Sequence, residues 1–235
     1  MSGQITFNNK KSFDDYSLHL IDVDIGYPEK KEVLVTVPYM NGNYDFSSLY
    51  GEDTYSNRQV KVKFALKSPY NKTRTLLNIQ YDKVVDWLFS SGIADLKIDY
   101  VEYIFNAKVK NISSKTKFLN TESIEVTFEC YPFRKPELFE GDDIWDEFNF
   151  ELDVAQIVDF NIIGNKIISL INVGAISVTP TVICDANFEV IHNEITYKFA
   201  SGMTKDYRFK LNKGDNIITV IGTGNISFKF KKEVI

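Results

Sequence analysis

The stretch "SIEVTFEC" (residues 123–130) is the clearest fold signal in the chain. Ile124, Val126, Phe128 and Cys130 alternate with Ser, Glu, Thr and Glu. A period of two predicts a β-strand that has one face on a core and one in water. The same alternation recurs in "EVLVTV" (32–37), "VKVKFAL" (60–66) and "VEYIFNAKV" (101–109). The first half of the chain is therefore predicted to be an antiparallel β-structure, with Val33, Val35 and Val37 facing its interior in the earliest strand.

One helix is expected among these strands, over residues 73–90. Apolar side chains recur there at helical spacing, and Gly92 stands where a helix C-cap glycine is common. The apolar positions are Leu77, Tyr81, Val84, Val85 and Leu88.

The second half is predicted to contain strands without a helix. Its short apolar runs are separated by Asn, Gly and Asp, which favours an antiparallel β-sandwich or jelly roll. The runs are "KIISLINVG", "ISVTPTVIC", "FEVIH", "EITYKF", "YRFKL", "NIITVIG" and "ISFKFK". "IGTGNISF" (221–228) lacks the Gly-Lys-Ser/Thr ending of a phosphate loop, so it is interpreted as a tight turn between the last two strands.

Charge divides the chain. Residues 1–135 hold 18 basic and 17 acidic residues, whereas residues 136–235 hold 9 and 15. "PELFEGDDIWDEFNFELD" (136–153) contributes eight of those acids and no base. We therefore expect one domain over 1–135, an acidic linker or strap over 136–153, and a second domain over 154–235.

Composition excludes several classes of protein. A hydrophobic content of 44%, with 14% aromatic residues, is sufficient for packed cores. No run approaches the roughly 18–20 apolar residues of a membrane span, and the N-terminus lacks the apolar core of a signal peptide. Synthesis in a cytoplasm, with no membrane partner, is therefore expected. A net charge of −5 argues against nucleic-acid binding, which requires a basic face.

The sequence contains no recognisable catalytic grouping. His19 and His192 are the only histidines, and Cys130 and Cys184 are too far apart for a metal knuckle. The acidic run holds Asp142, Asp143, Asp146 and Glu147, but it lacks the ligand spacing and central Gly of a calcium loop. No catalytic residue, cofactor or metal site is predicted, and the chain is not expected to be an enzyme.

The loop that precedes residue 58 is rich in both aromatic and turn-forming residues. Tyr44, Phe46, Tyr50 and Tyr55 alternate there with Asn, Gly, Ser and Asp. These rings pack either on their own domain, as in an Ω-loop, or on a neighbouring copy, since aromatic residues concentrate at interface cores. Arg58 is a candidate partner for Asp45 or Asp53 that would hold the shape of the loop.

Several stretches of the chain together match the pattern of one known family. The first comprises Phe7, Asn8, Asp15, Tyr16 and Leu18. The most specific comprises Pro28, Lys30, Lys31, Val37, Pro38, Gly42, Asp45, Phe46, Ser47, Gly51, Tyr55, Asn57 and Arg58. On these residues the N-terminal domain resembles the distal tail proteins (Dit) of long, flexible-tailed bacteriophages that infect Gram-positive hosts. "ECYPFRKP" (129–136), "NVGAISVTPTV" and "LNKGDNIITVIGTGNISFKFK" extend the likeness through the C-terminal half. Asn9 and Ser17 depart from the Gly common in the family.

The resemblance implies a mainly β fold. It consists of a tail-tube-like β-sandwich or barrel with one α-helix, followed by a galectin-like or jelly-roll β-sandwich. It also implies a virion structural protein of the tail tip or baseplate, assembled in the host cytoplasm. Six copies would form a homo-hexameric ring that joins the tail-tube protein to tail-tip, baseplate or receptor-binding proteins for host adsorption. In such a ring, Tyr44, Phe46, Tyr50 and Tyr55 are expected at or near a subunit contact.

Two alternatives stand beside this interpretation. The first is a carbohydrate-binding adhesion module that recognises host cell-wall polysaccharide, with Trp145, Tyr197 and Tyr207 as candidate stacking faces. The second is a wall hydrolase, which the missing catalytic grouping disfavours.

Overall fold

The computed structural model describes residues 3–49, 51–67, 74–118, 121–141 and 154–235. The chain forms two compact units, Met1–Arg134 together with Ile235, and Lys135–Val234. Within the described ranges, no helix has the length and apolar character needed to cross a bilayer.

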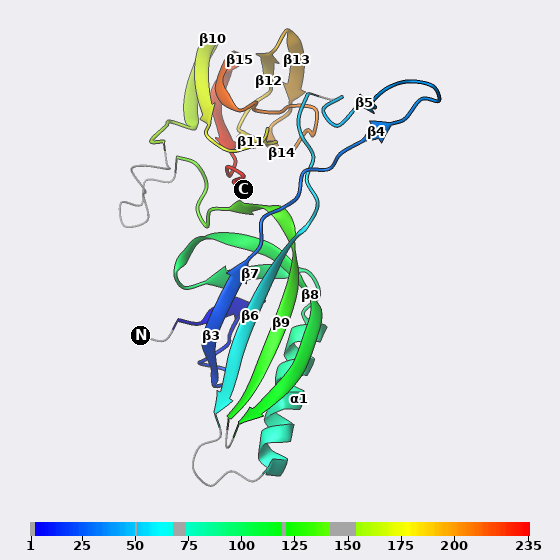
Figure 1. The fold of residues 1–235 in the computed structure, drawn as a ribbon. Coiled ribbons are helices and arrows are strands. Elements are labelled where there is room, and N and C mark those ends of the chain that lie inside the picture. The colour runs from blue at the N-terminus through cyan, green and yellow to red at the C-terminus, as the bar shows by residue number, and fades with distance from the viewer. Residues whose placement is uncertain (1–2, 50, 68–73, 119–120, 142–153) are drawn as a thin grey trace. The chain divides into compact units, whose positions relative to one another are not determined.

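The first unit is built on a seven-stranded sheet in the order β2-β1-β7-β8-β9-β6-β3 (Figure 1). Its pairs are antiparallel where the register is defined. The strands are β1 (Ile5–Phe7), β2 (Lys10–Lys11), β3 (Leu18–Ile25), β6 (Arg58–Lys67), β7 (Ala94–Ile98), β8 (Val101–Phe118) and β9 (Thr121–Lys135).

The pairing of β6 with β9 forms the centre of this unit. Val62 lies opposite Val126, and Phe64 opposite Ile124. These apolar side chains are fully buried, while the alternate position Lys63 is exposed. The period of two in the sequence therefore predicted both strands and their core-facing sides correctly.

The helix α1 (Arg74–Ser90) lies along one face of the sheet (Figure 1). Val84 and Leu88 are buried against the strands, as their helical spacing predicted, and Trp87, which that spacing did not include, is buried with them. Trp87 stacks on Tyr16 with ring centroids 4.4 Å apart, and its indole Nε1–H donates to the Phe7 carbonyl over 3.2 Å. Two residues beyond the helix, Gly92 has a φ of +62°, which suits a C-cap glycine.

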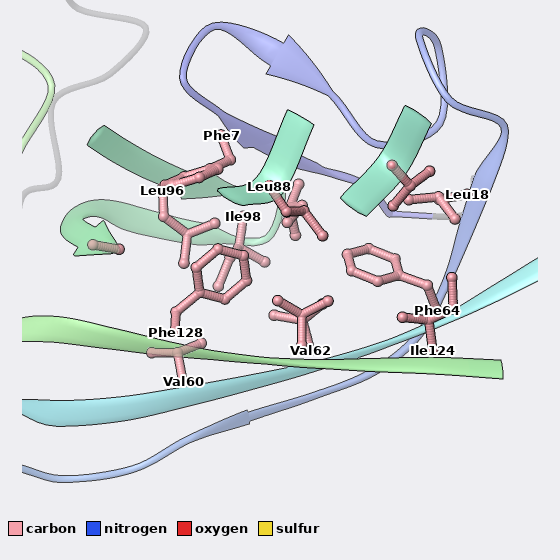
Figure 2. Close-up of a cluster of buried hydrophobic side chains, with 14 of the residues drawn as sticks. Phe7, Leu18, Val60, Val62, Phe64, Leu88, Leu96, Ile98, Ile124 and Phe128 are labelled. Atoms are coloured by element: carbon pink, nitrogen blue, oxygen red, sulfur yellow. The ribbon is translucent and has the colours of Figure 1, made fainter. Parts of the chain in front are cut away.

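The rest of the core is covered by the sheet itself, which bends back so that β1 and β7 lie over β6 and β9 (Figure 2). Phe7 on β1 meets Phe128 on β9 edge-to-face, with ring centroids 5.1 Å apart. Leu96 and Ile98 from β7 join the same cluster. The core of the first unit is thus covered by α1 together with β1 and β7.

The second unit is a six-stranded sheet around a separate core. Its path is β13-β12-β15-β11-β14, and β10 pairs along its own full length with β15 (Figure 1). The strands are β10 (Asp159–Asn172), β11 (Thr181–Cys184), β12 (Phe188–His192), β13 (Ile195–Phe199), β14 (Gly202–Thr204) and β15 (Gly214–Lys229). Phe209, from the segment between β14 and β15, packs at the centre against Tyr197, Phe199 and Phe228.

The prediction of a tight turn within residues 221–228 is wrong. β15 passes through this segment as one continuous strand, and Gly222 and Gly224 lie inside it. A Cβ at Gly222 would lie 2.4 Å from Cδ1 of Phe188, and one at Gly224 would lie 2.2 Å from Oδ1 of Asp185. These glycines therefore permit the close approach of neighbouring side chains, which sequence alone does not distinguish from a turn.

One of the apolar runs expected to be a strand in the second unit is not a strand. "YRFKL" forms no strand, and only Leu211 makes an isolated bridge, to Val178. Residues 142–153 of the acidic segment lie outside the described residues. The mainly β fold class with one helix is confirmed for the residues that the structure describes.

Removal of one ring from the sheet core is expected to destabilise the first unit strongly. Phe64→Ala should lower the free energy of unfolding by about 3–5 kcal/mol, because it deletes a fully buried ring and leaves a cavity. Lys63→Ala, on the exposed face of the same strand, should change it by less than about 0.5 kcal/mol. Denaturant unfolding of the two variants measures this contrast. Equal effects would contradict the assignment of the core face.

Candidate assembly surface

A long excursion from the sheet separates β3 from β6. The chain leaves β3 at Ile25 and returns at Arg58. In between, β4 (Leu34–Val35) and β5 (Tyr44–Asp45) pair as a short hairpin (Figure 1). We refer to residues 26–57 as the arm.

Main-chain and side-chain hydrogen bonds give the hairpin its shape. The Phe46 N–H donates to the Val33 carbonyl, and the Val33 N–H donates to Oγ of Ser47, each over 2.9 Å. Asp45 accepts the Ser47 N–H over 2.8 Å in an Asx turn. The hydrogen bonds from Ser47 lower the pKa of Asp45.

The base of the arm is held by a second set of contacts. Lys30 pairs with Asp53 over 2.8 Å, and this hydrogen bond raises the pKa of Lys30. The Lys31 N–H donates to the Thr54 carbonyl over 2.8 Å. Tyr55 packs edge-on against Phe133, with centroids 5.4 Å apart. The base is thus tied to its own unit.

The hairpin end of the arm is apolar and exposed. Its large apolar side chains are between 40% and 64% exposed, with Tyr39 fully exposed. They are Val33, Leu34, Val35, Val37, Tyr39, Tyr44, Phe46 and Leu49. A concentration of exposed apolar side chains on one element is typical of an interaction surface.

The predicted contact residues divide between the two ends of the arm. Tyr44 and Phe46 lie together on the hairpin, with centroids 6.2 Å apart and exposed fractions of 54% and 41%. Tyr55 packs at the base, on Phe133. Tyr50 lies outside the described residues. Their place at a subunit contact stays a prediction.

The prediction of a half-buried strand over 32–37 is wrong. Val33, Val35 and Val37 do alternate, but all three are at least 40% exposed and only two residues of the segment form a strand. The apolar face exists, yet no part of the described unit covers it fully. Pro28 and Pro38, which flank the segment, are the sequence signal against a central strand.

Arg58 does not hold the arm through either proposed acid. Asp53 pairs with Lys30, and Asp45 accepts from Ser47. The Arg58 side chain instead turns into the sheet, with Cζ 5.8 Å from the Phe105 ring centroid.

The second unit also exposes an apolar surface, on the outward face of β10 and β15. Ile163 and Ile167 from β10 lie beside Ile217 and Ile221 from β15. Alternate residues near both ends of β10 and along the first half of β15 enter the core, among them Ile168, Leu170, Ile218 and Val220. This sheet therefore carries isoleucines on its outer face as well as its inner one.

A shallow groove of about 460 Å³ lies nearby in the second unit. Asp185 accepts from the Asn225 main chain and side chain, and Asn161 donates to Asn225. Its one aromatic residue, Phe160, has Lys166 over its ring. Asp185, Asn161 and Asn225 thus bind one another, whereas Oγ of Ser227, also in the lining, is buried without a hydrogen-bond partner.

The residues considered for sugar stacking do not form one platform. Tyr197 is buried, and its hydroxyl donates to the Arg208 carbonyl. Tyr207 is exposed, with Lys205 over its ring. Trp145 lies outside the described residues. Tyr197 is therefore not available as a stacking face.

The histidines and cysteines occupy packing positions. His192 is buried edge-on against Phe209, and burial lowers its pKa. His19 lies edge-on against Phe13. Burial raises the pKa of the Cys130 thiol to about 12 and raises that of Cys184. Among the described residues, no three acidic, His or Cys side chains are grouped as metal ligands would be.

The fold of this chain is similar to that of a solved phage protein. No protein-family profile matches the sequence, and no curated protein matches it. Among solved structures, SPP1 Dit superposes with a TM-score of 0.66 at 10% identity, over 98% of this chain and 99% of that one. The chain has the fold of a phage Dit protein. SPP1 Dit is a paradigm of the hub adsorption apparatus in phages that infect Gram-positive bacteria.

The phage P2 baseplate contains a similar chain as well. In its activated conformation with Ca, the TM-score is 0.47 at 9% identity, over 100% of this chain and 99% of that one. With Sr, the TM-score is 0.42 at 9% identity, over 98% and 97%.

Both thiols are expected to be unreactive in the folded protein. With a pKa of about 12, Cys130 holds almost no thiolate at pH 8, and both cysteines are buried. Ellman's reagent at pH 8 should label neither within minutes, whereas the unfolded chain should release two equivalents of product. Rapid labelling of the folded chain would contradict the packing role.

Proposed function

We propose that the chain is a structural subunit of a phage tail tip or baseplate and assembles as a hexameric ring. The observation that carries this is the match to SPP1 Dit over both units, 98% of the chain. A match of this coverage concerns the two-unit architecture and not only a common β-sandwich. Because a fold does not by itself establish function, the surface chemistry must also agree.

The arm supplies the surface chemistry. Its hairpin end leaves large apolar side chains exposed, including Tyr44 and Phe46. Its base is fixed by Lys30–Asp53 and by Tyr55 on Phe133. An element fixed at its base and apolar at its end can lie across the next subunit in a head-to-tail contact, the kind that closes into a ring.

A structural role also agrees with the chemistry of the interior. His192, Cys130 and Cys184 serve as packing residues in the described structure. The ring would join the tail-tube protein on one side to tail-tip, baseplate or receptor-binding proteins on the other. Turnover of a substrate plays no part in this role.

The native mass of the purified chain tests the ring. Six copies of 27.0 kDa each give about 162 kDa, which is the expected species in mass spectrometry or light scattering. A strict 27.0 kDa monomer at high concentration would contradict assembly by the chain alone.

The arm can be tested separately with surface variants. The double substitution Tyr44→Ser and Phe46→Ser should reduce the 162 kDa species by at least tenfold at equal concentration, because exposed rings are typical interface anchors. Tyr207→Ser removes a more exposed ring, 73% against 54% for Tyr44, from the second unit and should leave assembly unchanged. Since all three side chains are exposed, each variant should still fold, with a far-UV circular dichroism spectrum like that of the unaltered chain. Full assembly of the double variant would contradict the proposal that the arm lies in the subunit contact.

A further inference from the structure

Arg58 lies in a position that an apolar residue would be expected to occupy. It begins β6 and faces the same way as Val60, Val62 and Phe64, and only 1% of its surface is exposed. Its cross-strand partner on β9 is the buried Cys130. A guanidinium therefore ends a row of core side chains.

One edge of this guanidinium is unused. Nε and Nη2 are both buried, and neither has a hydrogen-bond partner. These two nitrogens lie side by side in the planar group, and their N–H bonds point the same way. This is the edge that binds both oxygens of a carboxylate in a bidentate pair. Buried donors in native proteins are nearly always satisfied, so the edge requires an explanation.

A second arginine lies beside the first. Arg134, at the end of β9, has its Cζ 5.9 Å from the Phe105 ring centroid and 5.4 Å from that of Tyr103. Arg58 is over the same Phe105 ring. The Nε of Arg134 is also buried without a partner, while its Nη2 donates to the main-chain oxygen of Ile235.

The electrostatics of the pair favour an anion. Burial lowers the pKa of Arg58, and the positive charge of Arg134 lowers it further. The other groups that act on it are Cys130 and Tyr27, and neither is a carboxylate. Ring faces attract cations far more weakly than burial opposes an isolated charge. Two cations that share one ring therefore leave a site for negative charge.

We propose that Arg58 and Arg134 form a receptor for one carboxylate, which Nε and Nη2 of Arg58 bind in bidentate fashion with Nε of Arg134 beside them. A side chain of a neighbouring copy and a small free carboxylate share this chemistry. The neighbouring copy is the source that the position favours, because Arg58 is the residue at which the arm rejoins the sheet. That choice of source rests on the proposed ring, whereas the receptor itself does not.

The first measurement uses acetate as the probe on the full chain. Its melting temperature is followed at a dilution where the chain is monomeric, in increasing acetate against chloride at equal ionic strength and pH 7. A receptor predicts a saturable acetate-specific rise of about 2–4 °C. Arg58→Lys keeps the charge but removes the planar fork, so the rise should be lost. Lys61→Met changes the exposed face of the same strand and should keep it.

A second variant measures the unpaired charge directly. Arg58→Met replaces the guanidinium with an apolar side chain of similar length. In chloride, and at a dilution where both proteins are monomeric, it should melt at or above the temperature of the unaltered chain. A lower melting temperature would show that a partner already satisfies Arg58 in the free chain, which would overturn the proposal.

The second measurement distinguishes the two sources of carboxylate. If a neighbouring copy supplies it, Arg58→Lys should lose at least tenfold of the 162 kDa species and Lys61→Met should not. An acetate effect with unchanged assembly supports the receptor with a free anion as its ligand. If the unaltered chain stays monomeric at high concentration but still shows the acetate effect, the proposed ring is contradicted and the receptor is not. Absence of both effects overturns the receptor.

Discussion

The first unit depends on burying one continuous apolar face of its sheet, and α1 is the helix that packs on that face. β6 and β9 present fully buried side chains along their length, from Val60 to Leu66 and from Ile124 to Cys130. A helix of 17 residues covers only part of that face. The sheet therefore bends so that Phe7 reaches Phe128, and the contact of strand upon strand completes the core. The hydrophobic effect, which scales with apolar area removed from water, stabilises this closure.

This closure determines what remains outside. The arm connects the end of β3 to the start of β6. Because these two strands pair directly with each other, the arm has no place between them in the sheet. Its apolar hairpin end stays exposed, while its base packs on Phe133. At the same end of β6, Arg58 occupies the position where the apolar row stops. An exposed apolar hairpin and a buried, unpaired cation thus arise at one junction of the fold, and a neighbouring subunit would satisfy both.

Sequence patterns predicted the elements whose buried face is set by residues two, three or four positions apart along the chain. β6, β9 and α1 were predicted because their apolar residues recur at the period of the element. The pattern failed where the environment was decided by distant segments. Val33, Val35 and Val37 alternate like a core strand but are exposed, and Gly222 and Gly224 resemble a turn but lie within β15. The acid partners suggested for Arg58 were also wrong, since Lys30 and Ser47 take them.

The sequence by itself determined the mainly β class, the helix α1 and the inward faces of β6, β9 and α1, because these follow from local periodicity. Only the tertiary structure decided whether an apolar face is covered, which glycine allows a close approach and which charge is left without a partner. Each of those properties depends on atoms contributed by residues far away in the chain: Phe188 beside Gly222, and Phe105 and Arg134 beside Arg58. Side-chain packing in three dimensions fixes them, and a pattern along one strand cannot represent it.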